Sequence, residues 1–299
     1  MSDQASRLRN LIEQRALEES TSRKVGELDF GMAQDTRVIA VTSGKGGVGK
    51  TNLAVNLAVA LKLLGQRVMI IDADIGMANV NLLMGSVTNR SLLELLRSDV
   101  EAEDVVKDGA AGVKYISGAA GVEAALSLNR DEQRKLHQKL GRCSEMADIV
   151  IIDTGAGLNR NVIEFVLAAE EVLLITTPEP TAIADAYAVI KAYATYTDRR
   201  DIKLVVNRIR DEEESFEVVA KINQTTKNFL DVTVDCLGYI YEDKAVLDAV
   251  HKQEPFVLAR PNCAASRCVM ELADSLLSGE KMNSVSLGWR GFLERLFGY

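Results

Sequence analysis

The feature that most constrains this chain is the glycine-rich segment Gly44-Lys45-Gly46-Gly47-Val48-Gly49-Lys50-Thr51. It fits a phosphate-binding pattern in which two glycines enclose four residues and are followed by a lysine and a hydroxyl residue. The apolar run 37–42 before it predicts a buried β-strand, and residues 52–61 after it predict a helix. A strand, a glycine loop and a helix N-terminus in this order form an anion site, whereas a glycine-rich turn that binds nothing is the alternative.

The residues of this loop have separate predicted tasks in binding a nucleotide. Glycines let the backbone pass close to a phosphate, and the loop N–H groups and the positive end of the following helix point at the anion. Lys50 would hold the β- and γ-phosphate oxygens, and the hydroxyl of Thr51 would coordinate Mg²⁺. The loop therefore predicts a nucleoside triphosphate and Mg²⁺ as the bound groups.

Three carboxylates follow two other apolar runs at the points where predicted strands end. Asp72 and Asp74 come directly after one run, and Asp153 ends the run 149–152. Ligands of an open parallel sheet lie at the carboxyl ends of its strands, so these groups are expected beside the phosphates. The alternative for Asp72 and Asp74 is a pair of capping carboxylates at a strand–helix turn.

Composition is that of a globular protein with one large α/β domain. The chain has 299 residues, of which 47% are apolar and 26% charged, and its formal net charge is −8. This acidic balance argues against a surface that coats nucleic acid. No run approaches the length of a membrane span, and the first ten residues lack an apolar signal core, so a cytoplasmic location is expected. The four cysteines form no metal-binding pair.

Apolar runs alternate with helical stretches over residues 36–280, which predicts a doubly wound, mostly parallel α/β sheet. Residues 1–24 form a polar helical segment, 25–35 a linker, and 281–299 a polar spacer followed by a separate amphipathic tail. Helices are expected at 130–142 and 181–196. The predicted strands are 38–42, 67–72, 113–117, 149–153, 171–176, 202–206 and 234–240.

Lys45, directly after the first glycine, resembles the second lysine of the deviant Walker A ATPases, a group that includes MinD and ParA. In that group the lysine reaches across a dimer interface to the partner's nucleotide. The resemblance implies that ATP and Mg²⁺ are the cofactors and that ATP holds a face-to-face homodimer, which hydrolysis releases. It also implies the P-loop fold of the MinD type.

The carboxylates take roles within the same resemblance. Asp153 resembles a Walker B aspartate that holds Mg²⁺, and residues 154–157 resemble a switch II loop. Asp72 would support the metal beside Thr51. A carboxylate next to a transferring phosphoryl group contacts a water more readily than the anion, so Asp74 is predicted to orient the attacking water. The expected catalytic residues are then Lys45, Lys50 and Asp74.

The base-binding residues are predicted at two further strand ends. Asn207 and Arg208 occupy the place of a pair that contacts adenine in the MinD and ParA group, since an amide can bind the edge of adenine. A solvent-facing turn is the alternative. Residues 238–243 resemble the group's loop near the base, but Tyr241 stands where that loop has proline, so Tyr241 either flanks the base or packs elsewhere.

The C-terminal segment 288–299 has the stripe of an amphipathic helix. Its aromatic and leucine residues suit a bilayer interface, and it resembles the membrane-targeting tail of MinD-type proteins. The alternative is a helix that docks on its own core or on a partner. One short helix would bind lipid weakly, and two on an ATP-held dimer would bind far better. The predicted membrane residues are Trp289, Phe292, Leu293, Leu296 and Phe297.

The N-terminal element distinguishes between members of the group. Asp3, Gln4, Ala5, Leu8 and Arg9 match the D-Q-A-x-x-L-R element of the FlhG family, also called FleN, where it activates the signal-recognition-type GTPase FlhF. Asp3 can cap the helix that follows, and its apolar stripe suits a groove. A frayed terminal helix without a partner is the alternative.

Over its full length the chain thus resembles FlhG, which implies an ATPase switch that regulates flagellar number or placement. The implied partners are a second copy of the chain, an FlhF-like GTPase, an anionic membrane surface, flagellar C-ring proteins and a flagellar transcription regulator. The expected location is the cytoplasm, and the inner face of the cell membrane in the ATP state. A MinD-type division-positioning ATPase, a ParA-type DNA-partition ATPase and a scaffold with vestigial hydrolysis are the alternatives.

Overall fold

The structure of this protein is a computed structural model that describes residues 36–74, 79–85, 92–117, 128–197, 201–279 and 288–297. The predictions for segment 1–24, linker 25–35 and spacer 281–287 lie outside these residues. So do the predicted partner-activating residues Asp3, Gln4, Ala5, Leu8 and Arg9.

One sheet runs through the described part of the chain, with eight strands in the order β3-β4-β2-β5-β1-β6-β7-β8. All neighbouring pairs are parallel except β3–β4. The predicted fold class is confirmed, and each predicted strand is present with ends that shift by up to three residues. The strands are β1 (Arg37–Ser43), β2 (Val68–Ala73), β3 (Lys107–Asp108), β4 (Lys114–Ser117), β5 (Ile149–Ala156), β6 (Glu171–Thr176), β7 (Ile202–Ile209) and β8 (Asp235–Tyr241).

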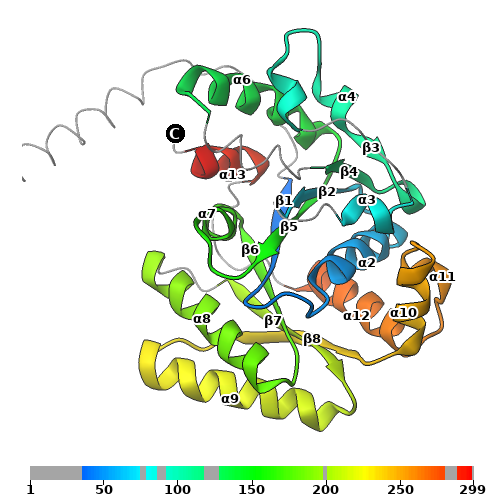
Figure 1. The fold of residues 1–299 in the computed structure, drawn as a ribbon, viewed down its shortest axis with the longest axis vertical. Coiled ribbons are helices and arrows are strands. Elements are labelled where there is room, and N and C mark those ends of the chain that lie inside the picture. The colour runs from blue at the N-terminus through cyan, green and yellow to red at the C-terminus, as the bar shows by residue number, and fades with distance from the viewer. Residues whose placement is uncertain are drawn as a thin grey trace, which may run out of the picture. The chain divides into compact units, whose positions relative to one another are not determined.

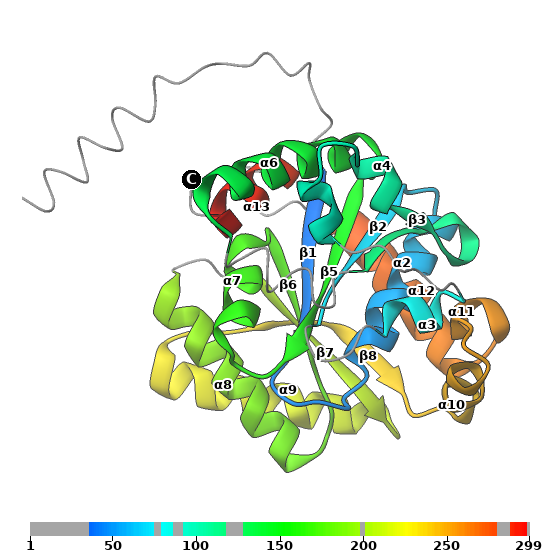
Figure 2. The same ribbon diagram turned by 45° about the horizontal axis from the view of Figure 1, so that its top comes forward.

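Helices cover both faces of this sheet, as Figures 1 and 2 show. Helices α2 and α10–α12 pack on one face, and α6–α9 and α13 on the other. The helices are α2 (Lys50–Leu63), α3 (Val80–Leu83), α4 (Ala102–Val105), α6 (Arg130–Gly141), α7 (Arg160–Ala168), α8 (Pro180–Tyr196), α9 (Glu212–Leu230), α10 (Lys244–His251), α11 (Phe256–Ala259), α12 (Ala264–Ser278) and α13 (Gly288–Phe297).

Burial on both faces explains why the central strands are continuously apolar. Side chains alternate across a strand, so Ile39 and Val41 of β1 enter the core under α2 while Val38 and Ala40 enter the core on the opposite face. The antiparallel edge strand β3 was missed by the sequence analysis. It has two residues, Lys107 and Asp108, neither of them apolar, so it leaves no periodic signal.

The C-terminal segment forms the predicted helix, but it is not a separate tail. Helix α13 packs against α6, α7 and β1 within the same compact unit as the rest of residues 34–299. Trp289 is 2% exposed, and Phe292 and Leu293 are 1% exposed each. Phe297 is buried and Leu296 is partly buried in the same core. The predicted membrane-facing stripe is therefore covered by the chain itself in this state.

Aromatic contacts and one hydrogen bond fix this docked position. Trp289 stacks on Phe292 with ring centroids 5.2 Å apart, and Phe292 stacks on Phe165 of α7 at 6.4 Å. The indole N–H of Trp289 donates to the carbonyl of Leu140 near the end of α6 at 2.6 Å, in addition to the backbone N–H of Arg142 that the same carbonyl accepts. Among the described residues, no helix is long and apolar enough to cross a bilayer.

Because Trp289 fills part of the domain core, Trp289→Ala is expected to lower the free energy of unfolding by about 3 to 5 kcal/mol. Urea unfolding followed by circular dichroism measures this loss. Arg290→Ala is the matched control, since the adjacent side chain is 75% exposed and its removal is expected to change little. Equal stability of the two variants would show that α13 is not part of the core.

Candidate nucleotide and active site

The phosphate-binding loop joins the end of β1 to the start of α2, and its glycines are required by close contacts. Gly49 has φ 98°, in the left-handed region, and a Cβ built on it would lie 2.4 Å from the side-chain nitrogen of Asn207. A Cβ on Gly44 would lie 2.3 Å from the backbone oxygen of Asp185 in α8. Larger residues at these two positions would push the loop away from β7 and α8.

Lys50 lies at the centre of the predicted carboxylates. Its ammonium nitrogen is 2.8 Å from Asp153 Oδ1 and 3.7 Å from Asp74 Oδ2. The parallel register of β2 and β5 pairs Asp72 with Asp153, which brings the two strand ends together. Because Lys50 and Asp153 are both buried, the pair depends on close contact to offset the cost of removing both charges from water.

Burial and mutual repulsion raise the pKa of the neighbouring carboxyls. Burial is the main cause of the raised pKa of Asp153, and Lys50 opposes it. Burial, with the charge of Asp153 next, raises the pKa of Asp72 to about 7. Both oxygens of Asp72 accept backbone N–H groups, from Asp74 at 3.2 Å and Val80 at 3.3 Å. Asp72 therefore fixes the backbone of Asp74 and Val80 just after the end of β2.

The donors present fit a magnesium ion held partly by a nucleotide. Asp153 Oδ2 is buried and has no hydrogen-bond partner in the described structure, and the neighbouring side chain of Thr51 lowers the pKa of Asp153. Across the described ranges no group of three or more His, Cys, Asp and Glu residues could hold a metal by itself. Mg²⁺ commonly takes one or two carboxylates and completes its shell with phosphate oxygens and waters, so this donor set suits it.

Lys45 is held by two residues that the sequence analysis missed. Its ammonium group lies 2.9 Å from Glu179 Oε2 and 2.9 Å from Thr181 Oγ1, at the start of α8. The hydrogen bond and charge of Lys45 lower the pKa of Glu179. The available signal was Pro180, a residue favoured at the first turn of a helix, because it marks a helix start directly after β6.

The three predicted base-binding residues line one pocket of about 600 Å³ beside the loop. That volume is in the range of small-molecule sites. The walls are Gly49, Asn52, Leu53, Asn207, Arg208, Ile240, Tyr241, Glu242, Asp243, Lys244, Val246, Leu247 and Phe256.

Two of these wall residues have defined partners. The amide nitrogen of Asn207 donates to the carbonyl of Val48 at 2.7 Å, so Asn207 also braces the phosphate loop. The ring of Tyr241 packs edge-on against Tyr239 at 5.5 Å, and its hydroxyl donates to Glu212 at 3.3 Å. Arg208 has φ 59°, a strained value for a residue with a side chain, as is common at binding sites.

The structure thus brings the predicted loop, carboxylates and base-pocket residues together at one edge of the sheet. Trp289, Phe292, Leu293, Leu296 and Phe297 are not part of this site. They belong to α13, which packs near the amino-terminal end of β1, whereas the phosphate loop follows the carboxyl end of β1 (Figure 2).

Comparisons with known proteins agree with this arrangement. The family model described as an AAA domain matches residues 36–206. The antiactivator FleN of Pseudomonas aeruginosa is 39% identical over 83% of this chain and 88% of its own length. The flagellum site-determining protein YlxH of Helicobacter pylori is 29% identical over 100% of this chain and 99% of its own.

A solved structure shares the fold. The septum site-determining protein MinD of Pyrococcus horikoshii, complexed with Mg-ADP, superposes with a TM-score of 0.64 at 27% identity. The match covers 83% of this chain and 99% of that one. Fold and site together define a P-loop ATPase of the MinD and ParA class. Within that class, the chain belongs to the FleN/FlhG family.

The raised pKa of Asp72 leads to a prediction about stability and pH. The pKa of Asp72 is about 7 in the folded protein and about 4 in the unfolded chain. Below pH 4 the carboxyl is protonated in both states, so burying it does not lower the free energy of unfolding through its charge. Above pH 7 it is ionised in both states, and burial of the charge lowers the free energy of unfolding by the full amount. Asp72→Asn removes this cost. The difference in the free energy of unfolding, variant minus wild type, should therefore increase as pH rises from 5 to 8. The increase should be up to about 1.4 kcal/mol per pH unit until pH 7 and should level off above it.

Urea unfolding of metal-free, nucleotide-free protein at pH 5, 6.5 and 8 measures the difference. Asp248→Asn, at an exposed position of α10, is the control and should show no such trend. A difference between wild type and Asp72→Asn that stays constant with pH would contradict the buried, raised carboxyl.

Proposed function

We propose that this protein is an ATP-driven switch that dimerises with ATP, binds the membrane in that state and regulates the number or placement of flagella. The observation that carries the proposal is the coexistence, in one domain, of an ATPase site with the second lysine Lys45 and a docked amphipathic helix α13. Membership of the FleN/FlhG family supports the flagellar role, because FleN and YlxH are relatives of this chain.

The hydrolytic step follows from the groups around Lys50. When phosphate arrives, Lys50 would exchange its contact with Asp153 for β- and γ-phosphate oxygens, which frees Asp153 for the metal. Thr51 and Asp153 would hold Mg²⁺, and Asp72 would support the metal site from behind these ligands. The bound Mg²⁺ would neutralise charge on the transferring phosphoryl group. Asp74 is 25% exposed beside Lys50, where it can accept hydrogen bonds from a water and orient it for attack.

Dimerisation requires Lys45 to leave its present partners. Lys45 is 39% exposed and Glu179 is 58% exposed, so their ion pair is screened by water and gives little stability. The lysine can therefore be recruited by a stronger anion, the nucleotide of a second copy of the chain. Asn207, Arg208 and Tyr241 would hold the adenine base in the adjacent pocket.

Membrane binding requires α13 to leave its groove. Its apolar side chains are covered in the described state, so they can reach lipid only after undocking. Two such helices on one ATP-held dimer would bind an anionic surface through effective concentration, although a single short helix binds weakly. The protein would then be cytoplasmic as a monomer and peripheral at the inner face of the membrane as a dimer.

Two changes test the switch. Deletion of residues 288–299 should abolish ATP-dependent sedimentation with phosphatidylglycerol vesicles, since it removes the lipid-binding stripe. Lys45→Ala should abolish both vesicle binding and the ATP-dependent dimer measured by light scattering. Lys221→Ala, at an exposed position of α9, is the control and should behave as wild type. Retention of vesicle binding by the deletion would exclude α13 as the membrane element.

The partner element lies in residues 1–22, where Asp3, Gln4, Ala5, Leu8 and Arg9 match the activator of an FlhF-type GTPase. A peptide of these residues should stimulate GTP hydrolysis by the FlhF-like GTPase of the same organism, and Gln4→Ala should remove the stimulation. Phosphate release measures both. A competent GTPase that does not respond would instead favour a MinD-type role in cell division. Flagellar C-ring proteins and a flagellar transcription regulator are further proposed partners.

A further inference from the structure

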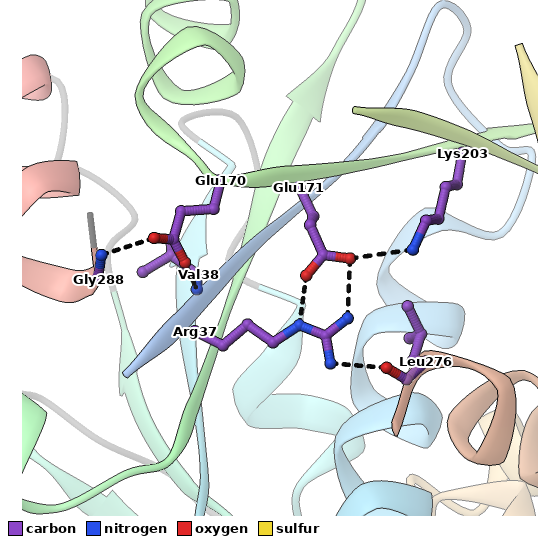
Figure 3. Close-up of polar contacts among 7 residues, drawn as sticks. All are labelled: Arg37, Val38, Glu170, Glu171, Lys203, Leu276 and Gly288. Atoms are coloured by element: carbon purple, nitrogen blue, oxygen red, sulfur yellow. Dashed lines mark hydrogen bonds and ion pairs between the residues drawn. The ribbon is translucent and has the colours of Figure 1, made fainter. Parts of the chain in front are cut away.

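Two adjacent carboxylates lie where α7 ends and β6 begins, at the sheet edge that holds the amino-terminal end of β1. Figure 3 shows Glu170 and Glu171 facing different elements. Glu170 faces the start of α13 and the backbone of β1, whereas Glu171 faces Arg37 and Lys203. Neither residue belongs to the nucleotide site described above.

Glu170 accepts the first N–H group of the docked helix. The backbone N–H of Gly288 donates to Glu170 Oε1 at 2.6 Å, and the N–H of Val38 donates to Glu170 Oε2 at 3.3 Å. Helix α13 has no acidic residue in its first turn, so Glu170 supplies from another element the negative charge that a helix N-terminus favours. Gly288 has φ 56°, a conformation that favours glycine.

Glu171 instead contacts two cationic side chains on the neighbouring strands β1 and β7. It pairs with the guanidinium of Arg37, and its Oε2 is 3.2 Å from the ammonium of Lys203. Burial alone would raise the pKa of Glu171, but the hydrogen bonds and charges of Arg37 and Lys203 outweigh it and lower the pKa. Arg37 also donates to the carbonyl of Leu276 near the end of α12, at 2.6 Å.

The polar contact of Glu170 matters because the apolar contacts of α13 do not strongly distinguish its two environments. Phe292, Leu293 and Phe297 are removed from water both in the groove and at a lipid surface, and lipid chains are about as apolar as leucine. The indole N–H of Trp289 also finds acceptors in either place, since tryptophan favours the interface of a membrane. The hydrogen bond between Glu170 and the first turn of α13 is present only while the helix is docked.

We propose that Glu170 acts as a catch for α13. By this we mean that the hydrogen bond from Gly288 to Glu170 holds the helix docked against α6, α7 and β1, and so sets how readily the helix is released to lipid. The inference about release to lipid rests on the proposed membrane function, while the inference about docking does not. Glu170 is a positioning residue, because it acts on α13 and touches no nucleotide. It lies one residue before β6, the strand that leads to Glu179 and hence to Lys45.

Hydrogen–deuterium exchange of residues 288–297 in the full-length, ADP-bound protein without lipid tests the catch. The exchange rate of these amides follows the opening equilibrium of the helix. Glu170→Ala should speed it by about fivefold, the typical effect of losing a helix cap. Glu170→Gln keeps the shape and one acceptor oxygen, so it should give a smaller increase.

Glu171→Gln is the matched control, because it removes the same charge from the adjacent position but loosens Arg37. It should leave exchange of α13 at the wild-type rate. Exchange in Glu170→Ala at the wild-type rate, or equal acceleration in Glu171→Gln, would overturn the catch. If Glu170→Ala folds poorly, Glu170→Gln decides the matter by the same comparison.

Vesicle binding by the same proteins separates the two proposals. In ADP, Glu170→Ala should sediment with phosphatidylglycerol vesicles about fivefold more than wild type. Faster exchange of α13 in a variant that binds no vesicles, together with wild-type protein that binds none in ATP, would support the catch and contradict the membrane function.

Discussion

The contact between Lys50 and Asp153 is the interaction on which the rest of this structure depends. It places a cation and an anion in a buried position, where the parallel register of β1 and β5 brings the start of α2 beside Asp153. β1 delivers the phosphate loop, β5 delivers Asp153, and β2 delivers Asp72 to the same edge of the sheet. Burial is the main cause of the raised pKa of both carboxyls, and a bound cation would favour their ionised forms.

The same strands connect this site to the opposite edge of the domain. β1 begins at Arg37, which pairs with Glu171, and ends at the phosphate loop. β6 begins at Glu171 and leads to Glu179, the partner of Lys45. If Lys45 leaves Glu179 on dimerisation, as proposed above, the change occurs beyond one end of β6, whose other end adjoins Glu170 and α13. Under the proposed function, this arrangement would give the nucleotide state a short physical route to α13.

The fold was predicted correctly from the sequence, and the residues of the candidate nucleotide site were found beside one another, because both depend on local sequence patterns. Strands buried on both faces leave apolar runs, and the loop glycines are fixed by close contacts such as that of Gly49 with Asn207. Lys50, Asp72, Asp74 and Asp153 follow from these runs, because the carboxyl ends of parallel strands meet at one edge.

The remaining features depend on contacts between distant residues. Glu179 contacts Lys45 across 134 positions and Glu170 contacts Gly288 across 118. Pro180 marks the helix start beside Glu179, but no local pattern pairs residues so far apart in the sequence. The docking of α13 could not be told from lipid binding, since an amphipathic stripe suits a groove and a bilayer equally. Strand β3 has two residues and leaves no pattern.

Trp289 is the only tryptophan in the chain, so its fluorescence tests most directly whether α13 leaves its docked position in the ATP state. The measurement compares emission and acrylamide quenching of the Asp74→Ala protein with vesicles in ADP and in ATP with Mg²⁺. In ADP we expect a protected indole that donates to the carbonyl of Leu140. In ATP we expect a changed emission spectrum that short-chain brominated lipids quench. Identical spectra in the two nucleotides, with no quenching by brominated lipid, would show that α13 stays docked and that the domain is not a membrane switch.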